Sequence, residues 1–178
     1  KRNYTNFTIE IASQHKFDTN KLCEWMTENV AEFSPPIEIS QFENGMSNPS
    51  FLISGRSDKN FVLRKKPPGK LLPSAHAIDR EHKIMGALIN SEVPVPKMYG
   101  FCSDRNIIGT EFFIMEHVLG RVFDNVSLPE LPTQERSAIY ESMAITLAKL
   151  HTVDYKSLGL EDFGRVGGYL SRQIKRWS

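Results

Sequence analysis

The chain has 178 residues, of which 24% are charged and 40% are hydrophobic, and this is the composition of an ordinary globular domain. Its formal net charge of +1 gives no electrostatic basis for nucleic acid as the main partner, and no apolar run reaches the ~18 residues that a membrane span requires. Two cysteines are too few for a disulfide framework, so we expect an intracellular protein from a reducing compartment.

The beginning of the chain predicts an arm and then a helix. Residues 1–17 are polar and weakly patterned, which indicates an arm on the surface. Asp18 is a favourable residue for the start of a helix. It is followed at helical spacing by four apolar residues: Leu22, Trp25, Met26 and Val30. The two prolines at 35–36 end this segment.

Three strands are expected next, at 37–42, 51–54 and 61–64. Alternate side chains of a strand share a face, so Val62 and Arg64 point the same way. A helix follows, with one stripe that contains a carboxylate among apolar side chains: Ile78, Glu81, Met85 and Leu88. Because a carboxylate in such a place is costly unless it is paired, we predict an ion pair between Arg64 and Glu81.

Two further strands are expected at 98–101 and 112–116, separated by a turn at 103–106. Gly120 begins an irregular connector, and Thr133 is expected to cap a long helix. That helix has an apolar stripe: Ile139, Met143, Leu147 and Leu150. The tail is rich in glycine and ends in basic residues. Five strands with one helix between the third and fourth form the layout of a kinase small lobe.

Two segments are candidates for binding phosphate. A short polar loop joins the first two strands: Asn44-Gly45-Met46-Ser47-Asn48. Its backbone N–H groups suit phosphate oxygens, although a plain hairpin turn is the better explanation of this loop taken alone, because short Gly-Ser-Asn turns are common. In kinases a cation on a strand contacts the nucleotide phosphates and is positioned by a helix carboxylate. Arg64 with Glu81 fits that arrangement, and a purely structural salt bridge is the alternative.

Other features carry less information. The strand and connector Phe113-Ile114-Met115-Glu116-His117-Val118 fit a segment that binds adenine through its backbone, or simply a buried strand. Asp162-Phe163-Gly164 spells a metal-binding triplet of protein kinases. We interpret it as a coincidence because no His-Arg-Asp loop precedes it. Four histidines show no spacing typical of metal ligands: His76, His82, His117 and His151.

Several short motifs follow one another along the chain: Phe42-Glu43-Asn44-Gly45-Met46-Ser47-Asn48-Pro49, Val62-Leu63-Arg64-Lys65-Lys66-Pro67-Pro68-Gly69, Asp79-Arg80-Glu81, Val93-Pro94-Val95-Pro96, Met115-Glu116 and Leu147-Ala148-Lys149-Leu150-His151. In this order they resemble the aminoglycoside phosphotransferase and choline-kinase-like family. The run 64–81 looks most like the kinase-like module found N-terminal to acyl-CoA dehydrogenase domains in animals.

The resemblance implies an α+β, protein-kinase-like fold. We expect a surface arm (1–17), a small lobe with a preceding helix (18–118), and a connector with the start of a helical large lobe (119–178). The small lobe would have a five-stranded antiparallel sheet and one packed helix. The nucleotide site would be formed by Gly45, Met46, Ser47, Asn48, Val62, Arg64, Glu81, Met115, Glu116, His117 and Val118.

The resemblance implies ATP- and Mg²⁺-dependent phosphoryl transfer to the hydroxyl of a small molecule. For the branch linked to acyl-CoA dehydrogenases, it implies that the acceptor is a hydroxyacyl-CoA. FAD is implied only if an acyl-CoA dehydrogenase domain follows, and a mitochondrial or peroxisomal location is also implied. The family's His-Gly-Asp loop and metal-binding motif do not occur here. We therefore expect an inactive fragment without catalytic residues or metal ligands. Two alternatives are a non-catalytic docking module attached to a dehydrogenase, and an interaction domain whose apolar stripe is buried in an oligomer.

Overall fold

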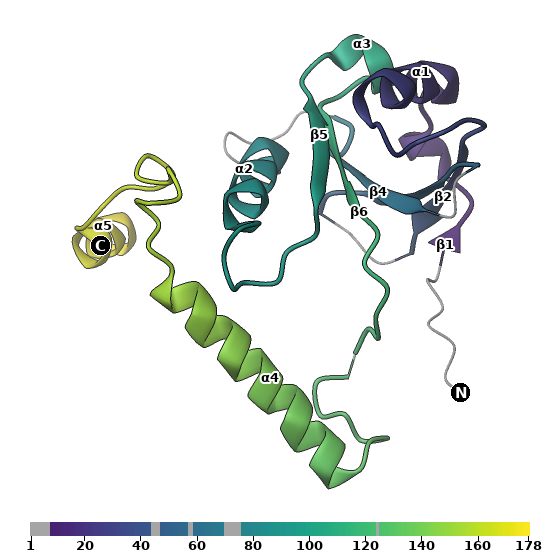
Figure 1. The fold of residues 1–178 in the computed structure, drawn as a ribbon. Coiled ribbons are helices and arrows are strands. Elements are labelled where there is room, and N and C mark those ends of the chain that lie inside the picture. The colour runs from purple at the N-terminus through teal and green to yellow at the C-terminus, as the bar shows by residue number, and fades with distance from the viewer. Residues whose placement is uncertain (1–7, 44–46, 57–58, 70–75, 124) are drawn as a thin grey trace.

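An antiparallel sheet forms the centre of the computed structural model, which describes residues 8–43, 47–56, 59–69, 76–123 and 125–178 (Figure 1). In the described residues the sheet has six strands in the order β1-β2-β3-β4-β6-β5. Their bounds are Thr8–Ile9 (β1), Glu38–Phe42 (β2), Ser50–Ser54 (β3), Asn60–Lys65 (β4), Met98–Cys102 (β5) and Phe112–Glu116 (β6). This is the mixed, kinase-like architecture that the sequence predicts.

The sheet has one strand more than the five predicted. Strand β1 comes from the segment expected to be a surface arm, and its Thr8 and Ile9 pair with Phe42 and Gln41 of β2. The Gln41 side chain also accepts a hydrogen bond from the Ala12 N–H at 3.1 Å. A strand of two residues is too short to show an alternating pattern, so it cannot be predicted from the sequence.

Helix α1 (Thr19–Asn29) covers one face of the sheet. Asp18 caps it as predicted, because its carboxylate accepts hydrogen bonds from the N–H groups of Asn20 and Lys21 at 3.0 and 3.1 Å. The buried side chains of this helix join strand residues in the main core: Leu22, Met26, Phe51, Ile53, Phe61, Leu63, Phe112 and Ile114. This face therefore supplies most of the hydrophobic stabilisation.

Helix α2 (Ile78–Leu88) lies on the opposite side of the sheet, beside β5 (Figure 1). Its His82 ring packs 5.5 Å from the ring of Phe101 and 5.9 Å from that of Phe113, and burial lowers the pKa of His82. Arg64 of β4 pairs with Phe113. Register partners share a face, so Arg64 lies on the same side of the sheet as α2.

The described residues also contain a short 3-10 helix, Ser13–His15, and three more α-helices. The turn predicted near 103–106 is instead helix α3 (Arg105–Ile108), which is capped by the Asp104 carboxylate at 2.8 Å from the Asn106 nitrogen. Helix α4 (Thr133–Thr152) begins after Pro132 without a side-chain cap, so the predicted capping role of Thr133 is wrong. Helix α5 (Tyr169–Trp177) lies in the basic tail.

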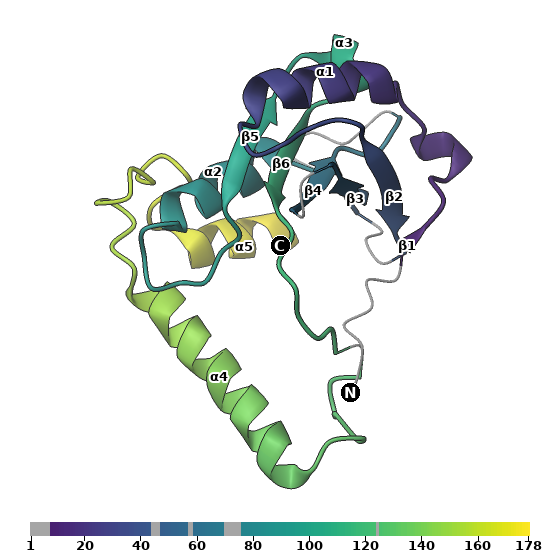
Figure 2. The same ribbon diagram turned by 45° about the vertical axis from the view of Figure 1, so that its right-hand side comes forward.

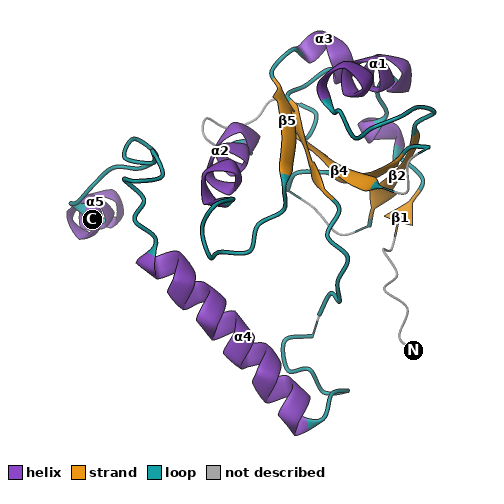
Figure 3. Ribbon diagram, viewed as in Figure 1, coloured by secondary structure: helices purple, strands orange, loops and turns teal. Residues whose placement is uncertain are grey.

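Helix α4 stands clear of the sheet in both views of the molecule, and long loops connect it to its neighbours (Figures 1, 2 and 3). Three of the four residues of its predicted apolar stripe are exposed: Met143, Leu147 and Leu150. In the described part of the chain, no helix combines the length and hydrophobicity needed to cross a membrane.

An ion cluster around Glu32 fastens the segment after α1 to the sheet. The Glu32 carboxylate contacts Lys97 at 2.5 Å, and it also contacts Lys59 in the β3–β4 hairpin. Hydrogen bonds from these two ammonium groups lower the pKa of Glu32 from 4.5 to about 2. A carboxyl group whose pKa is depressed by folding stabilises the folded state when it is ionised.

We therefore expect Glu32→Gln to lower the free energy of unfolding at pH 7 slightly. The stabilisation from Glu32 is complete above pH 4.5 and is lost as the pH falls towards about 2. Urea unfolding from pH 7 to pH 2.5 should show the difference between variant and parent shrinking below pH 4.5. A difference that does not change with pH would contradict this explanation.

Candidate functional site

The predicted ion pair between strand and helix is present. Arg64 Nε donates to Glu81 Oε2 at 2.6 Å, and the two side chains are 28% and 36% exposed. The strand holds Arg64 in place through its pairing with Ser50 on one side and Phe113 on the other. The helix holds Glu81 one turn from its start. Sequence reasoning from a misplaced carboxylate therefore located this pair correctly.

Two residues of the β2–β3 region extend the pair into a network. The Ser50 hydroxyl accepts a hydrogen bond from Arg64 Nη1 at 3.1 Å. The Asn48 side chain, only 3% exposed, donates from Nδ2 to Glu81 Oε1 at 2.8 Å. Both oxygens of the Glu81 carboxylate are thus bound, and the guanidinium is held at two of its nitrogens.

His76 completes the network, which we call the Arg64 cluster: Arg64, Glu81, Asn48, Ser50 and His76. Its Nδ1 lies 2.9 Å from Asn48 Oδ1. A carboxylate oxygen accepts, so the Asn48 Nδ2 group donates to Glu81, and its Oδ1 is left to accept from an N–H at His76 Nδ1. His76 has a φ of 56°, in the left-handed region that favours glycine. Such backbone strain often occurs at functional sites.

This role of His76 is not predicted from the sequence, in which His76 is a candidate only for a metal ligand. Its one available signal was its position just before the helix that carries Glu81. Asn48 was predicted as part of a phosphate loop, but its side chain is used inside the cluster. Gly45 and Met46 lie outside the described residues. Ser47 is exposed at the edge of the described loop.

The predicted adenine-binding residues divide between the two sides of the sheet. Val62 and Met115 are register partners on the face that carries Arg64. Glu116 pairs with Phe61, and its carboxylate accepts from the Lys97 N–H at 3.0 Å. His117 lies 6.3 Å from the Phe42 ring, and burial lowers its pKa. Val118 is exposed. The arrangement places the buried Val62 and the half-buried Met115 on the same face as a cation.

Arg64 retains one unused donor group. Nη2 has no hydrogen-bond acceptor among the described residues, and the side chain is partly open to solvent. A guanidinium stays charged at any working pH and suits planar contacts with phosphate oxygens. Within the same described residues, no three His, Cys, Asp or Glu side chains converge to hold a metal ion.

We expect Asn48→Ala to lower the free energy of unfolding by about 1–3 kcal/mol, because it leaves Glu81 Oε1 and His76 Nδ1 without their partner in a half-buried place. Urea unfolding would measure the change. Asn29→Ala is a suitable control, since it removes one exposed hydrogen bond, to the Trp25 carbonyl, and should cost less than about 0.5 kcal/mol. Equal losses in both variants would contradict a special role for Asn48.

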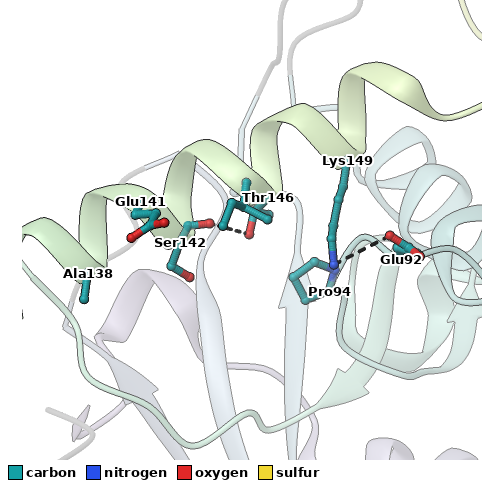
Figure 4. A pocket seen from close by; sticks show the side chains of 8 residues that line it. Glu92, Pro94, Ala138, Glu141, Ser142, Thr146 and Lys149 are labelled. Atoms are coloured by element: carbon teal, nitrogen blue, oxygen red, sulfur yellow. Dashed lines mark hydrogen bonds and ion pairs between the residues drawn. The ribbon is translucent and has the colours of Figure 1, made fainter.

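A shallow pocket of about 430 Å³ lies apart from this cluster, between the α2–β5 loop and helix α4 (Figure 4). Glu92 and Pro94 line it from the loop, and Ser142, Thr146 and Lys149 from the helix. Lys149 Nζ lies 3.7 Å from Glu92 Oε2. This contact joins the C-terminal end of α4 to the α2–β5 loop of the small lobe.

Comparisons with known proteins agree with the geometry. The model of the phosphotransferase enzyme family matches residues 38–178. A relative from Arabidopsis thaliana named probable acyl-CoA dehydrogenase IBR3 is 48% identical over 97% of this chain. The human acyl-CoA dehydrogenase family member 11 is 45% identical over 95%. The match spans only 22% of either relative.

One solved structure is similar over most of the chain. It is a Ralstonia eutropha protein provisionally named an aminoglycoside phosphotransferase. The TM-score is 0.78 and the identity 43%, and the match covers 91% of this chain and 46% of that one. At this level of identity the likeness covers sequence as well as fold.

Proposed function

The chain belongs to the phosphotransferase enzyme family, and on that premise we propose that it is the ATP-binding lobe of a small-molecule phosphotransferase. The observation that supports this most directly is the Arg64 cluster, a partly exposed guanidinium that Glu81 and Ser50 hold through Nε and Nη1, which leaves its Nη2 group to donate to a ligand. The apolar side chains of Val62 and Met115 lie on the same face, Val62 buried and Met115 half-buried. A cation beside apolar side chains suits a ligand with phosphates at one end and a base at the other.

In this proposal each member of the cluster has a separate task. Arg64 donates from Nη2 to a phosphate oxygen, and such charge-assisted bonds are about twice as strong as neutral ones. Glu81 and Ser50 hold the guanidinium plane, so that little side-chain entropy is lost on binding. Asn48 and His76 hold Glu81. The base packs on Val62, and backbone groups of Glu116, His117 and Val118 form hydrogen bonds with its edge.

The proposal assigns binding and orientation of ATP to this chain, and not the transfer step. For a longer protein that includes this lobe, we propose phosphoryl transfer to a hydroxyl, with a hydroxyacyl-CoA as the acceptor. The relatives named acyl-CoA dehydrogenases support this acceptor. FAD would belong to such a dehydrogenase domain.

The same relatives support a second candidate, a kinase-like docking module that serves an attached dehydrogenase without binding nucleotide. The two candidates differ in what they require of Arg64. A docking module needs only the structural ion pair, whereas an ATP-binding lobe needs the spare donor group.

Calorimetric titration of the purified chain with ATP, ADP, AMP and inorganic triphosphate separates the two. We expect ATP to bind more tightly than AMP, because the phosphates contribute through Arg64. Absence of binding by all four at millimolar concentration would favour the docking module. For the longer protein, transfer of labelled phosphate to a hydroxyacyl-CoA, but not to the acyl-CoA that lacks the hydroxyl, would identify the acceptor.

A further inference from the structure

A second arginine on helix α2 makes a contact with a distant part of the chain. The guanidinium carbon of Arg80 lies 4.1 Å from the centroid of the Phe163 ring. Its Nη2 donates to the Phe163 backbone oxygen at 2.6 Å. Arg80 directly precedes Glu81, whereas Phe163 lies in the loop between α4 and α5.

Phe163 is held in a defined position. Its N–H donates to the Leu160 carbonyl at 3.0 Å, which closes a turn, and the Leu160 side chain is buried. The triplet Asp162-Phe163-Gly164, which the sequence analysis set aside as a coincidence, thus supplies a contact to α2 through its middle residue. An arginine stacked on a ring and bonded to a carbonyl is fixed in two directions, which a lysine would not be.

The first turn of α2 is held by tertiary contacts. The helix has no side-chain cap at Ala77, and in this turn the buried Ile78 and the contact of Arg80 with Phe163 join it to the rest of the chain. Neighbouring residues of a helix move together, since they are only 1.5 Å apart along the axis. A shift of Arg80 therefore also shifts Glu81, whose 2.6 Å bond to Arg64 is sensitive to small displacements.

We infer that Arg80 is a positioning residue: its contact with Phe163 holds the first turn of α2 so that Glu81 keeps Arg64 in the orientation that receives phosphate. The effect on nucleotide binding rests on the proposed function, whereas the effect on the Arg64–Glu81 pair does not. The loop between α4 and α5 would then influence the nucleotide site through α2, and by reciprocity nucleotide binding would stabilise that loop.

Two readouts on the 178-residue chain test this. The first is the solvent exchange rate of the Arg64 Nε–H proton, measured by NMR in the absence of nucleotide. The second is the affinity for ATP. We expect Arg80→Gln and Phe163→Leu each to speed the exchange and to weaken ATP binding about threefold to tenfold. The double variant should resemble either single one, because both remove the same contact.

Coupling through Arg64 is the decisive observation. In an Arg64→Met background, Arg80→Gln should no longer change ATP affinity, which a general loss of structure would not produce. Lys83→Gln is the matched control, since Lys83 is an exposed cation on the same helix and should affect neither readout. If Arg80→Gln fails to fold, Arg80→Lys replaces it, because it keeps the charge without the stacked plane.

The outcomes separate the two proposals. Exchange of the Arg64 Nε–H proton that is unchanged in Arg80→Gln and Phe163→Leu would overturn the inference, whatever the ATP affinity. A chain that binds no ATP, but whose exchange rate responds to both substitutions, would overturn the proposed function and leave the positioning role supported.

Discussion

Arg64→Met should weaken ATP binding by this chain about 10- to 100-fold, because a hydrogen bond to a charged group contributes about 1.5–3 kcal/mol. The substitution removes the cation that faces the nucleotide side of the sheet and keeps a side chain of similar length. Glu81 is left without its arginine, but it is 36% exposed and keeps the bond from Asn48. Isothermal titration with ATP and with AMP would measure the change, and the loss should be larger for ATP.

Arg56→Met is the matched control for charge. Arg56 is an exposed cation at the β3–β4 hairpin, at the other end of the strands from Arg64, so its removal should leave ATP affinity within about twofold. Arg64→Lys should fall between the two, because lysine keeps the charge but loses the planar fork. An Arg64→Met chain that binds ATP as the parent does would contradict the role of Arg64 in phosphate binding.

The ion pair at the centre of this site could be predicted from the sequence because two periodic patterns, one of a strand and one of a helix, each placed one of its members. The alternation of β4 placed Arg64 on the face opposite Phe61 and Leu63, which are both fully buried. The helical spacing of α2 placed Glu81 on a stripe of apolar residues. A carboxylate on one element and a cation on the neighbouring strand satisfy each other, so the pairing followed from the cost of leaving either one alone.

Other parts of the site and fold had no comparable signal. Strand β1 and helix α3 have two and four residues, too few for a period to emerge. The bond between His76 and Asn48 joins two loops and depends on the left-handed backbone of His76, which tertiary structure imposes. The contact of Arg80 with Phe163 links residues 83 positions apart. Pattern reasoning finds elements more readily than the loop contacts between them.

The two faces of the sheet have different roles, core packing and ligand binding, although residues of the two faces alternate along each strand. Side chains of one face, with α1, form the apolar core, while the opposite face presents Arg64, Val62 and Met115 beside α2. The core face can be tightly packed because it needs no opening. The other face remains partly exposed, and there every described charge of the cluster is held by hydrogen bonds. Rigidity on one face thus supports preorganised binding on the other.

That division predicts a large stability loss from Phe51→Ala. Phe51 of β3 is fully buried, its ring packs edge-on 5.3 Å from Phe17, and the buried Lys65 ammonium lies 5.9 Å above it. Removing such a ring from a core costs about 3–5 kcal/mol. The free energy of unfolding of a typical domain is only about 5–15 kcal/mol, so urea unfolding, followed by tryptophan fluorescence, should show a much lower midpoint.

The neighbouring residue provides the control. Leu52 pairs with Val62 on the opposite face and is only half-buried, so Leu52→Ala leaves a smaller cavity and should cost less than about 2 kcal/mol. In addition, Phe51→Ala should leave the Arg64 Nε–H exchange of the folded chain unchanged, because no hydrogen bond of the cluster involves it. If Leu52→Ala destabilised the chain as much as Phe51→Ala, the assignment of the core to the α1 face would be wrong.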